Sequence, residues 1–322
     1  MHGLVLKSTG SRYKVLITES ATHPSLWENM NPDNIVNAVL RGKLRLENTK
    51  STNPVVVGDR VKLIYTKNGW AIDQVLPRRN YIIRKATNQS KSTHIIAANI
   101  DLACVIATIV APSTSTGFID RFLVTAEAYA IPAALLFHKT DLIQDDAAAM
   151  TYQSELAQIY RLIGYPVLYT SIKHSESLEP LKKLMAHKIT LFSGHSGVGK
   201  SSLINAIQPH LKLKTKNISY KHLKGTHTTT YAELLPLDFG GFVIDTPGIK
   251  EFGIVHTDKY EISHYFPEMR QYLGQCKFNN CLHIQEPDCK VLEALENGII
   301  APSRYKSYLS ILENEDFKTV MK

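Results

Sequence analysis

The sequence predicts a multidomain α/β protein, and three observations along its 322 residues support that fold class. The first part of the chain contains short runs of alternating polarity separated by turn residues, which is typical of a small β-barrel. Apolar, β-branched runs then alternate with helical stretches, which indicates a mostly parallel sheet with helices on both faces. Cysteine and histidine residues gather near the C-terminus, which indicates a small metal-binding unit followed by helices. We therefore expect three domains, at residues 1–80, 81–255 and 256–322.

Five strands are expected in the N-terminal domain, at residues 3–7, 13–17, 37–40, 60–65 and 70–76. Turn signals such as Gly58-Asp59 and Asn68-Gly69 separate them. Several short strands in so short a segment suit a closed barrel, and an OB-fold is the barrel that we expect.

The N-terminal domain is also strongly basic. Residues 1–86 contain 14 Lys or Arg and 6 Asp or Glu, a net charge of +8, which equals the net charge of the whole chain. A surface that binds a polyanion explains this asymmetry, and a merely solvated basic face is the alternative. Tyr13, Tyr65 and Trp70 are candidates for contacting nucleic-acid bases, and each is equally compatible with the barrel core.

In the central domain, strands are expected at residues 102–110, 133–137, 166–169, 189–192 and 242–244. Helices are expected between them, at residues 120–130, 145–163, 178–186 and 200–207. This alternation is typical of a doubly wound parallel sheet. Cys104 lies inside the first apolar run and is expected to be a buried, small hydrophobic residue.

A phosphate-binding loop follows the run 188–192 and leads into the helix predicted after it. Its glycines let backbone N–H groups surround phosphates at the positive end of the helix dipole. Lys200 should neutralise the β- and γ-phosphates, and the Ser201 hydroxyl should bind Mg²⁺. The loop residues are Gly194, His195, Ser196, Gly197, Val198, Gly199, Lys200, Ser201 and Ser202.

Further residues that respond to the γ-phosphate are expected after this loop. Asp245 ends an apolar run and is the candidate Walker B acid, which would hold Mg²⁺ through water, and the Gly248 amide would sense the γ-phosphate. The segment 224–230 is rich in hydroxyl groups and lies where a switch I loop belongs, so that Thr228 or Thr229 would complete the Mg²⁺ shell. A plain β-edge is the alternative for this run of threonines.

Hydrolysis needs a group that orients the attacking water. In Ras-like GTPases, a glutamine directly after the glycine that corresponds to Gly248 orients this water. This chain has Ile249 at that position, so slow intrinsic hydrolysis is expected. His227 is the candidate for positioning the water, because imidazole accepts or relays a proton near neutral pH. Lys200 and Thr228 complete the catalytic set. A switch histidine with no catalytic role is the alternative for His227.

The base-reading loops decide between guanine and adenine. The carboxylate of Asp141 can accept hydrogen bonds from N1–H and the N2 amino group of guanine, which adenine does not present in that pattern. Lys139 would lie along the face of the base. His138 replaces the usual asparagine and can make one of its two hydrogen bonds, so weaker guanine binding rather than lost specificity is expected. The two loops are His138, Lys139, Thr140 and Asp141, and Ser171, Ile172 and Lys173.

The order of these motifs is unusual. The base-reading loops precede the phosphate-binding loop along the chain, whereas Ras-like GTPases have the opposite order. This exchange is a circular permutation, and it predicts a circularly permuted P-loop GTPase domain with GTP/GDP and Mg²⁺ as its ligands.

Three thiols and one imidazole lie within fourteen residues near the C-terminus: Cys276, Cys281, His283 and Cys289. A Cys₃His set suits tetrahedral Zn²⁺, and four protein ligands leave no open coordination position, so one structural zinc ion is expected. Unrelated free thiols are the alternative.

Taken together, the permuted order, the Gly-His-Ser-Gly-Val-Gly-Lys-Ser loop, the Gly-Thr-His-Thr-Thr-Thr segment at residues 225–230 and the Asp-Thr-Pro-Gly motif at residues 245–248 resemble one bacterial family. It is the ribosome small-subunit-dependent GTPase A family (RsgA, also called YjeQ), and the resemblance covers nearly the whole chain. The resemblance implies a factor in late maturation of the 30S subunit, with 16S rRNA as a contact and with slow GTP hydrolysis that the 30S subunit stimulates.

The remaining expectations concern location and competing functions. No apolar stretch reaches the ~18 residues needed to cross a bilayer, and no basic start precedes a long apolar run, so a cytoplasmic protein without membrane partners is expected. A monomer that does not bind DNA is also expected. An RNA-binding assembly protein that holds GTP without turnover is the main alternative. A P-loop enzyme that acts on RNA is another.

Overall fold

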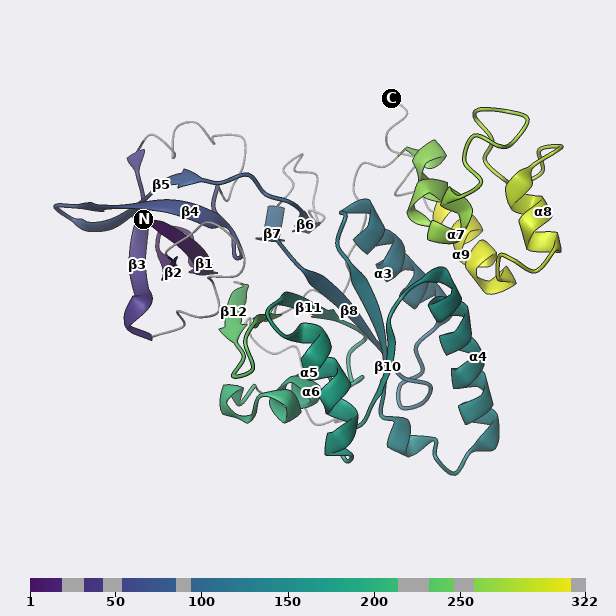
Figure 1. Cartoon of the computed structure of the whole chain (residues 1–322), viewed down its shortest axis with the longest axis horizontal. Coiled ribbons are helices and arrows are strands. Elements are labelled where there is room, and N and C mark those ends of the chain that lie inside the picture. Colours follow the sequence, from purple (N-terminus) through teal and green to yellow (C-terminus); the bar gives the residue numbers. More distant parts are fainter. Residues whose placement is uncertain (19–31, 43–53, 85–93, 214–231, 246–257, 314–322) are drawn as a thin grey trace, which may run out of the picture.

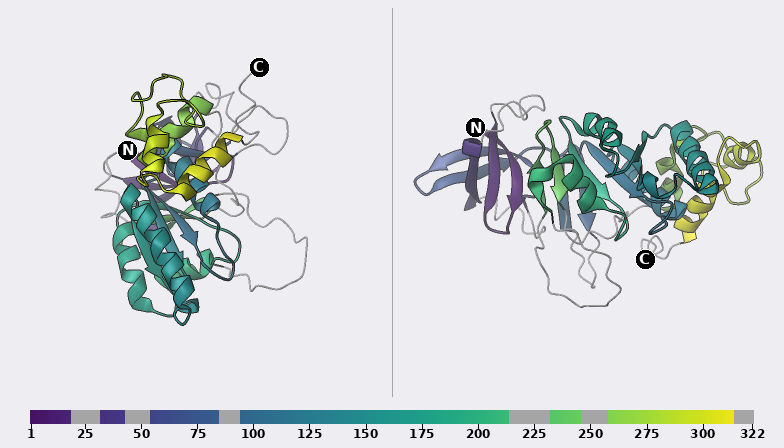
Figure 2. Two further views of the ribbon diagram at one scale, coloured as in Figure 1. Left: turned by 90° about the vertical axis from the view of Figure 1, so that its right-hand side faces the viewer. Right: turned by 90° about the horizontal axis from the view of Figure 1, so that it is seen from below.

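The computed structural model of this chain describes residues 1–18, 32–42, 54–84, 94–213, 232–245 and 258–313. An N-terminal barrel, a central sheet covered by helices and a C-terminal helical unit follow one another along the molecule (Figures 1 and 2).

The N-terminal barrel has five strands that close on themselves. The strands run in the order β1-β2-β3-β5-β4, and β4 pairs again with β1. Among the barrel strands that the structure describes, only β3 and β5 run parallel to each other, which is the connectivity of an OB-fold. The strands are β1 (His2–Ser8), β2 (Tyr13–Thr18), β3 (Ile35–Leu40), β4 (Arg60–Thr66) and β5 (Gly69–Val75). All five predicted strands are therefore confirmed.

The aromatic residues of the barrel divide between its core and its surface. Tyr13 is 1% exposed and packs with Val15, Val61 and Ile72, so its assignment as a candidate base contact was wrong. Tyr65 is 74% exposed at the end of β4. Its ring lies edge-on to the ring of Trp70, with 5.2 Å between centroids. The pair Tyr65 and Trp70 therefore remains a candidate surface for bases.

The central sheet is parallel except at one edge. Its order is β10-β9-β8-β11-β13-β12, and of these described strands only β12 runs antiparallel to its neighbour, β13. The strands are β8 (Leu102–Ala107), β9 (Ala133–His138), β10 (Val167–Thr170), β11 (Ile189–Ser193), β12 (Glu233–Pro236) and β13 (Phe242–Asp245). The antiparallel strand β12 was not predicted from the sequence.

Helices cover both faces of this sheet, as the alternating sequence pattern predicted. Helices α3 (Thr116–Ala128) and α4 (Ala147–Ile163) pack on one face, where Ala103, Val105 and Leu135 belong to the same core. Helices α5 (Glu179–Met185) and α6 (Lys200–Ile207) pack on the other face around Cys104, Ile106 and Leu136. Cys104 is fully buried, as expected for a small hydrophobic residue.

The barrel and the central sheet are joined through backbone and side chains. Strand β1 pairs with β12 at Lys7 and Glu233, and the side chains of these residues form an ion pair at 2.5 Å. The barrel and the central sheet therefore form one continuous sheet of eleven strands. A small hairpin of β6 (Tyr81–Arg84) and β7 (His94–Ala98), also absent from the prediction, follows the barrel.

The C-terminal unit packs on α3 through a buried charged cluster. It contains the 3₁₀ helix η5 (Lys259–Tyr265) and the helices α7 (Pro267–Arg270), α8 (Lys290–Glu296) and α9 (Pro302–Glu313). Arg304 of α9 is fully buried and lies 2.7 Å from Asp120 of α3 and 2.6 Å from Glu268 of α7. The hydroxyl of Tyr160 on α4 donates to the same Asp120 carboxylate. This cluster ties the C-terminal unit to two helices of the central domain.

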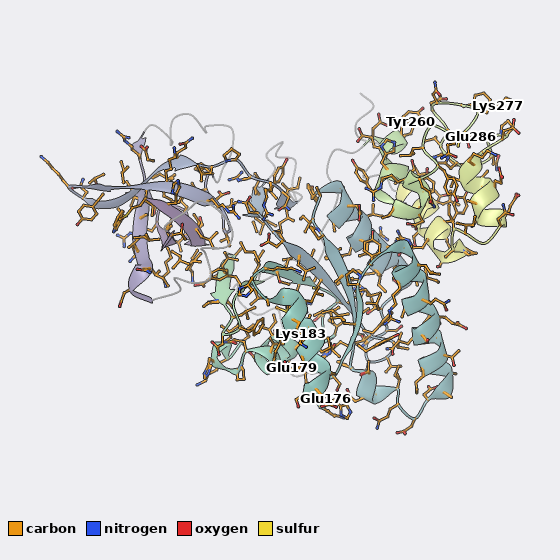
Figure 3. The ribbon with its side chains drawn as sticks, viewed as in Figure 1. Glu176, Glu179, Lys183, Tyr260, Lys277 and Glu286 are labelled. Carbon is orange, nitrogen blue, oxygen red and sulfur yellow. The ribbon has the colours of Figure 1, made fainter. Side chains whose placement is uncertain are left out.

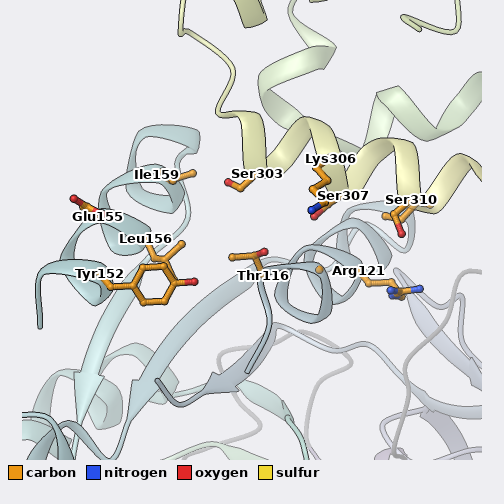
Figure 4. A pocket seen from close by; sticks show the side chains of 12 residues that line it. Thr116, Arg121, Tyr152, Glu155, Leu156, Ile159, Ser303, Lys306, Ser307 and Ser310 are labelled. Atoms are coloured by element: carbon orange, nitrogen blue, oxygen red, sulfur yellow. The ribbon is translucent and has the colours of Figure 1, made fainter. Parts of the chain in front are cut away.

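A groove of about 480 Å³ lies at this junction, between α4 and α9 and above the start of α3 (Figure 4). Leu156, Ile159 and Ile311 line its apolar part, and Arg121 and Lys306 are its two cations. Within the described ranges, no helix combines the length and the apolar character needed to span a bilayer.

Candidate functional site

The candidate nucleotide site lies at the carboxyl edge of the parallel sheet. The first base-reading loop follows β9, the second follows β10, and the phosphate-binding loop follows β11. Because β9 pairs in parallel with both β8 and β10, and β8 pairs in parallel with β11, these loops leave the sheet at one edge. Ligands of open α/β sheets bind at this edge.

The phosphate-binding loop is tight, and its glycines are required by contacts. A Cβ on Gly194 would lie 2.7 Å from the carbonyl oxygen of Ile106. Gly199 has a φ of +102° at the N-cap of α6, where a side chain would be strained. The Lys200 ammonium donates to the carbonyl oxygens of Gly194 and His195. Burial lowers the pKa of Lys200. These contacts build a backbone cradle with one cation, which suits phosphate groups.

The candidate base-reading residue Asp141 is held in place by contacts with residues of the second base-reading loop. Ser171 donates its hydroxyl to one carboxylate oxygen of Asp141 at 2.6 Å, and Lys173 lies 2.9 Å from the other. Burial raises the pKa of Asp141, but the hydrogen bonds from Ser171 and Lys173 outweigh it and hold the pKa below its ordinary value. Asp141 is therefore ionised at neutral pH, as an acceptor for guanine must be.

Lys139 connects the base-reading loop to the phosphate-binding loop. Its ammonium donates to the carbonyl oxygen of Gly197 at 2.7 Å and to that of Ala111 at 2.6 Å. Lys139 adopts a left-handed backbone conformation, with φ 59° and ψ 38°, at the start of the 3₁₀ turn Thr140–Leu142. The sequence did not indicate Ala111, because it contributes only a backbone oxygen.

His138 is buried between the same two loops. Its Nδ1 lies 3.0 Å from the hydroxyl oxygen of Thr170, and its Nε2 faces Gly199, where a Cβ would lie 3.1 Å away. His138 thus has one hydrogen bond to a side chain, and a packing contact with Gly199 accompanies it. Burial, followed by the charge of Lys139, lowers the pKa of His138 to about 4, so the ring is neutral at pH 7.

The remaining predicted residues are only partly described. Asp245 is the last residue of β13, and Leu191 of β11 pairs with Ile244, so the backbone of Asp245 reaches the same sheet edge. Thr228, Thr229, His227, Gly248 and Ile249 lie outside the described residues.

The candidate metal site brings together all four predicted ligands. The ligand atoms of Cys276, Cys281, His283 and Cys289 lie within 4.8 Å of one another. Nδ1 of His283 lies 3.3 Å from Sγ of Cys289 and 3.7 Å from Sγ of Cys276. Zn–S bonds of about 2.3 Å and Zn–N bonds of about 2.0 Å in a tetrahedron require separations of this size. The donor set therefore fits a zinc ion with no open position.

Further contacts fix the shape of the loop that carries His283, one of the candidate metal ligands. The carboxylate of Glu286, a residue labelled in the C-terminal unit in Figure 3, accepts hydrogen bonds from the backbone N–H groups of Leu282, Ile284 and Gln285. Burial raises the pKa of Glu286, but these hydrogen bonds outweigh burial and lower the pKa to about 2. The hydroxyl of Tyr305 donates to the carbonyl oxygen of His283 at 2.7 Å. These residues were missed from the sequence, because they orient the ligands rather than bind the metal.

Known proteins match this chain closely. The family model described as RsgA GTPase matches residues 75–255. The small ribosomal subunit biogenesis GTPase RsgA 2 of Bacteroides thetaiotaomicron is 46% identical over 98% of this chain and 97% of its own length. The small ribosomal subunit biogenesis GTPase RsgA of Porphyromonas gingivalis (strain W83) is 47% identical, with 98% of each chain covered.

Solved structures agree with these sequence matches. The crystal structure of YjeQ from Thermotoga maritima matches with a TM-score of 0.76 and 35% identity, covering 100% of this chain and 99% of that one. YloQ, described as a circularly permuted GTPase, matches with a TM-score of 0.75 and 29% identity, covering 100% and 96%. The order of the motifs, the fold and these similarities agree, and the chain belongs to the RsgA GTPase family.

Proposed function

We propose that this chain binds and hydrolyses GTP at the carboxyl edge of its central sheet and acts in biogenesis of the small ribosomal subunit. The hydrogen bond between Lys139 and Gly197 is the observation that carries the proposal, because it brings a base-reading residue and a phosphate-binding residue into one site. The names of relatives such as the Bacteroides thetaiotaomicron protein support the role in small-subunit biogenesis.

The base is recognised by residues of two loops. Asp141 accepts the N1–H and N2 hydrogens of guanine, Lys139 lies along the base, and Ile172 borders it. His138 holds the first loop against Gly199 and Thr140 closes its turn, while Ser171 and Lys173 fix the carboxylate of Asp141. The contacts of Asp141 at 2.6 Å and 2.9 Å support this assignment.

The phosphates are held by the loop 194–202, with its backbone N–H groups and Lys200 as the donors. Mg²⁺ neutralises charge on the β- and γ-phosphates when it is bound. Ser201 and one of Thr228 and Thr229 would hold it directly, and Asp245 would hold it through water. The backbone position of Asp245 at the sheet edge supports its part in this set.

Hydrolysis is proposed to be slow in the free protein, because Ile249 has no polar atom with which to orient water. His227 is proposed to position the attacking water once the protein is docked on its partner. In single-turnover measurements on 30S subunits, His227→Ala should lower the hydrolysis rate while nucleotide affinity stays close to that of wild type. An unchanged rate would remove His227 from the mechanism.

The flanking units, residues 1–80 and 256–322, are proposed to contact the 30S subunit, including 16S rRNA. Exposed cations on the barrel support an RNA-binding role, since they can pair with phosphates. They include Arg12, Lys14, Lys62 and Lys67. The exposed ring of Tyr65 beside Trp70 can stack on an unpaired base. We further propose that the protein acts as a monomer in the cytoplasm and that the Cys₃His set holds a structural zinc ion.

Phosphate release from GTP and from ATP, each with and without purified 30S subunits, tests the proposed function. Release from GTP should rise strongly with 30S subunits, and release from ATP should stay at background. Nucleotide binding without release under any of these conditions would support a static-ligand role instead. Equal turnover of both nucleotides would contradict the assignment of Asp141.

A further inference from the structure

The connection between β8 and α3 lies outside the nucleotide motifs, yet it borders the phosphate-binding loop. This connection closes on itself through hydrogen bonds between Thr108 and Thr114, at 2.9 Å and 3.1 Å, and between Thr108 and Pro112. Pro112 comes within 3.6 Å of the position that a Cβ on Gly197 would take. Ala111 accepts a hydrogen bond from Lys139. The connection therefore forms a compact turn that contacts both the first base-reading loop and the phosphate-binding loop.

The first turn of α3 places an aromatic ring on the phosphate-binding loop. Ser115 caps this helix, and its hydroxyl accepts a hydrogen bond from the backbone N–H of Phe118 at 3.3 Å. The Phe118 ring lies over the His195 imidazole, with centroids 3.8 Å apart and an angle of 33° between the ring planes. Both side chains are half-buried. Aromatic pairs in such contact contribute beyond the area that they bury.

The backbone of His195 is part of the phosphate cradle. Its carbonyl oxygen accepts hydrogen bonds from the Lys200 ammonium at 3.2 Å and from the Val198 N–H at 3.4 Å. The ring and this carbonyl belong to one residue, so a contact that fixes the His195 ring also restrains the backbone that helps to place Lys200. Since positioning of charged groups dominates phosphoryl transfer, small displacements here affect nucleotide binding.

Phe118 is presented from a helix that is itself held in place. Two residues along α3, Asp120 is bound by Arg304 at 2.7 Å and by Tyr160 at 2.8 Å. Arg304 and Asp120 are fully buried, so this contact resists displacement of α3 along its axis. The ring of Phe118 therefore reaches His195 from a fixed position.

From these contacts we propose that Phe118 is a positioning residue for nucleotide binding. Its ring holds His195, and through the His195 carbonyl it holds Lys200, in the geometry that binds the β- and γ-phosphates. This proposal rests on the proposed function and adds to it a residue outside the sequence motifs that predict the nucleotide site. It acts on the phosphates and not on the base, because guanine recognition is assigned to the loops after β9 and β10.

Fluorescent-nucleotide titrations of the full chain test this proposal. Phe118→Ala should weaken the affinity for GDP and GTP by about three- to tenfold, which corresponds to the loss of one aromatic pair. The preference for guanine over xanthine nucleotides should not change. Phe118→Tyr should restore most of the affinity, and Phe118→Leu, which keeps the apolar volume, should not.

A double-mutant cycle separates the contact from general damage to the helix. If the two rings act as a pair, Phe118→Ala combined with His195→Ala should weaken affinity no more than the stronger single change does. Phe122→Leu is the matched control, because Phe122 lies one turn further along α3 and packs in the core between this helix and the central sheet. This control should lower the thermal midpoint but leave nucleotide affinity within about twofold of wild type.

The outcomes distinguish this proposal from the proposed function. If wild type binds guanine nucleotides and Phe118→Ala binds them equally well, or if the two substitutions add independently, the positioning role is overturned. If wild type binds no guanine nucleotide, the proposed function itself fails. If Phe118→Ala does not fold, the comparison of Phe118→Leu with Phe118→Tyr decides the question.

Discussion

The ammonium of Lys139 lies 2.7 Å from the carbonyl oxygen of Gly197, although 58 residues separate them in the chain. In the permuted order, Lys139 precedes the phosphate-binding loop, so the two loops can meet only through the fold of the parallel sheet. The fold thus rebuilds in space the arrangement of an unpermuted GTPase site, and the following predictions depend on it.

Asp141→Asn should change which base the site prefers. The carboxylate is held by Ser171 and Lys173 as an acceptor, and an amide at this position presents a donor toward N2, where xanthine carries an oxygen. We expect GTP affinity to fall at least tenfold and affinity for xanthosine triphosphate to rise. Competition titrations with the two nucleotides measure both changes. If the preference for GTP remained as in wild type, Asp141 would not be the base-reading residue.

Protonation of His138 should destabilise the protein in acid. Its pKa is about 4 in the folded chain, whereas an unfolded histidine has a pKa of about 6.5. As the pH falls below 6.5, His138 takes up a proton in the unfolded chain, whereas in the folded chain it stays neutral until the pH approaches 4. The contribution to stability is therefore complete above pH 6.5 and declines toward pH 4, by about 2 kcal/mol at pH 5.

Urea unfolding of wild type and His138→Asn between pH 8 and pH 5 checks this decline. The asparagine variant lacks the titrating ring, so its stability should fall less over this range. Parallel pH dependences of the two proteins would show that His138 titrates normally in the folded state.

Zinc removal should loosen the C-terminal unit alone. Cys276, Cys281 and Cys289 pack in the same core as Val291 and Tyr308, so loss of the proposed zinc ion should disturb the packing of this core. Elemental analysis should find one zinc ion per chain, and Cys281→Ser should reduce that content. After chelation, amide hydrogen exchange should rise in residues 258–313, while GDP affinity should change by less than about threefold. Retained protection there would mean that the metal is not structural.

Arg304 should be far more sensitive to substitution than the neighbouring Arg270. Arg304→Met leaves Asp120 and Glu268 buried without their cation, so a loss of about 3–5 kcal/mol in the free energy of unfolding is expected. Arg270 pairs with Glu127 at 2.9 Å, but its side chain is 50% exposed. Arg270→Gln should therefore cost less than about 1 kcal/mol. Chemical denaturation compares the two variants, and equal losses would contradict a buried cluster that joins the two units.

Local patterns made much of this molecule predictable. Helix α6 begins and ends at the predicted residues, because the phosphate-binding loop requires a helix directly after Lys200. The four candidate metal ligands could be picked out because three thiols and an imidazole at close spacing are typical of a metal site, and the structure brings them together. The five barrel strands were visible from alternating polarity and from the turns between them.

Contacts between distant, chemically ordinary residues were not predictable in this way. Phe118 carries no motif, and its importance depends on which loop the fold places beside it. Asp120 and Arg304 are 184 residues apart, and each is an unremarkable helix residue by sequence. Tyr13 fitted both a core and a surface position, because alternation along a short strand does not tell which face closes the barrel.

The pairing of β1 with β12 has a consequence for how the barrel can be studied. Without the barrel, β12 would be the outermost strand of the central sheet, and its unpaired backbone would invite pairing with another chain. A truncated protein that lacks the barrel would therefore combine loss of the proposed RNA contacts with self-association, and the two effects would be confused. Substitution of single exposed cations keeps that edge covered.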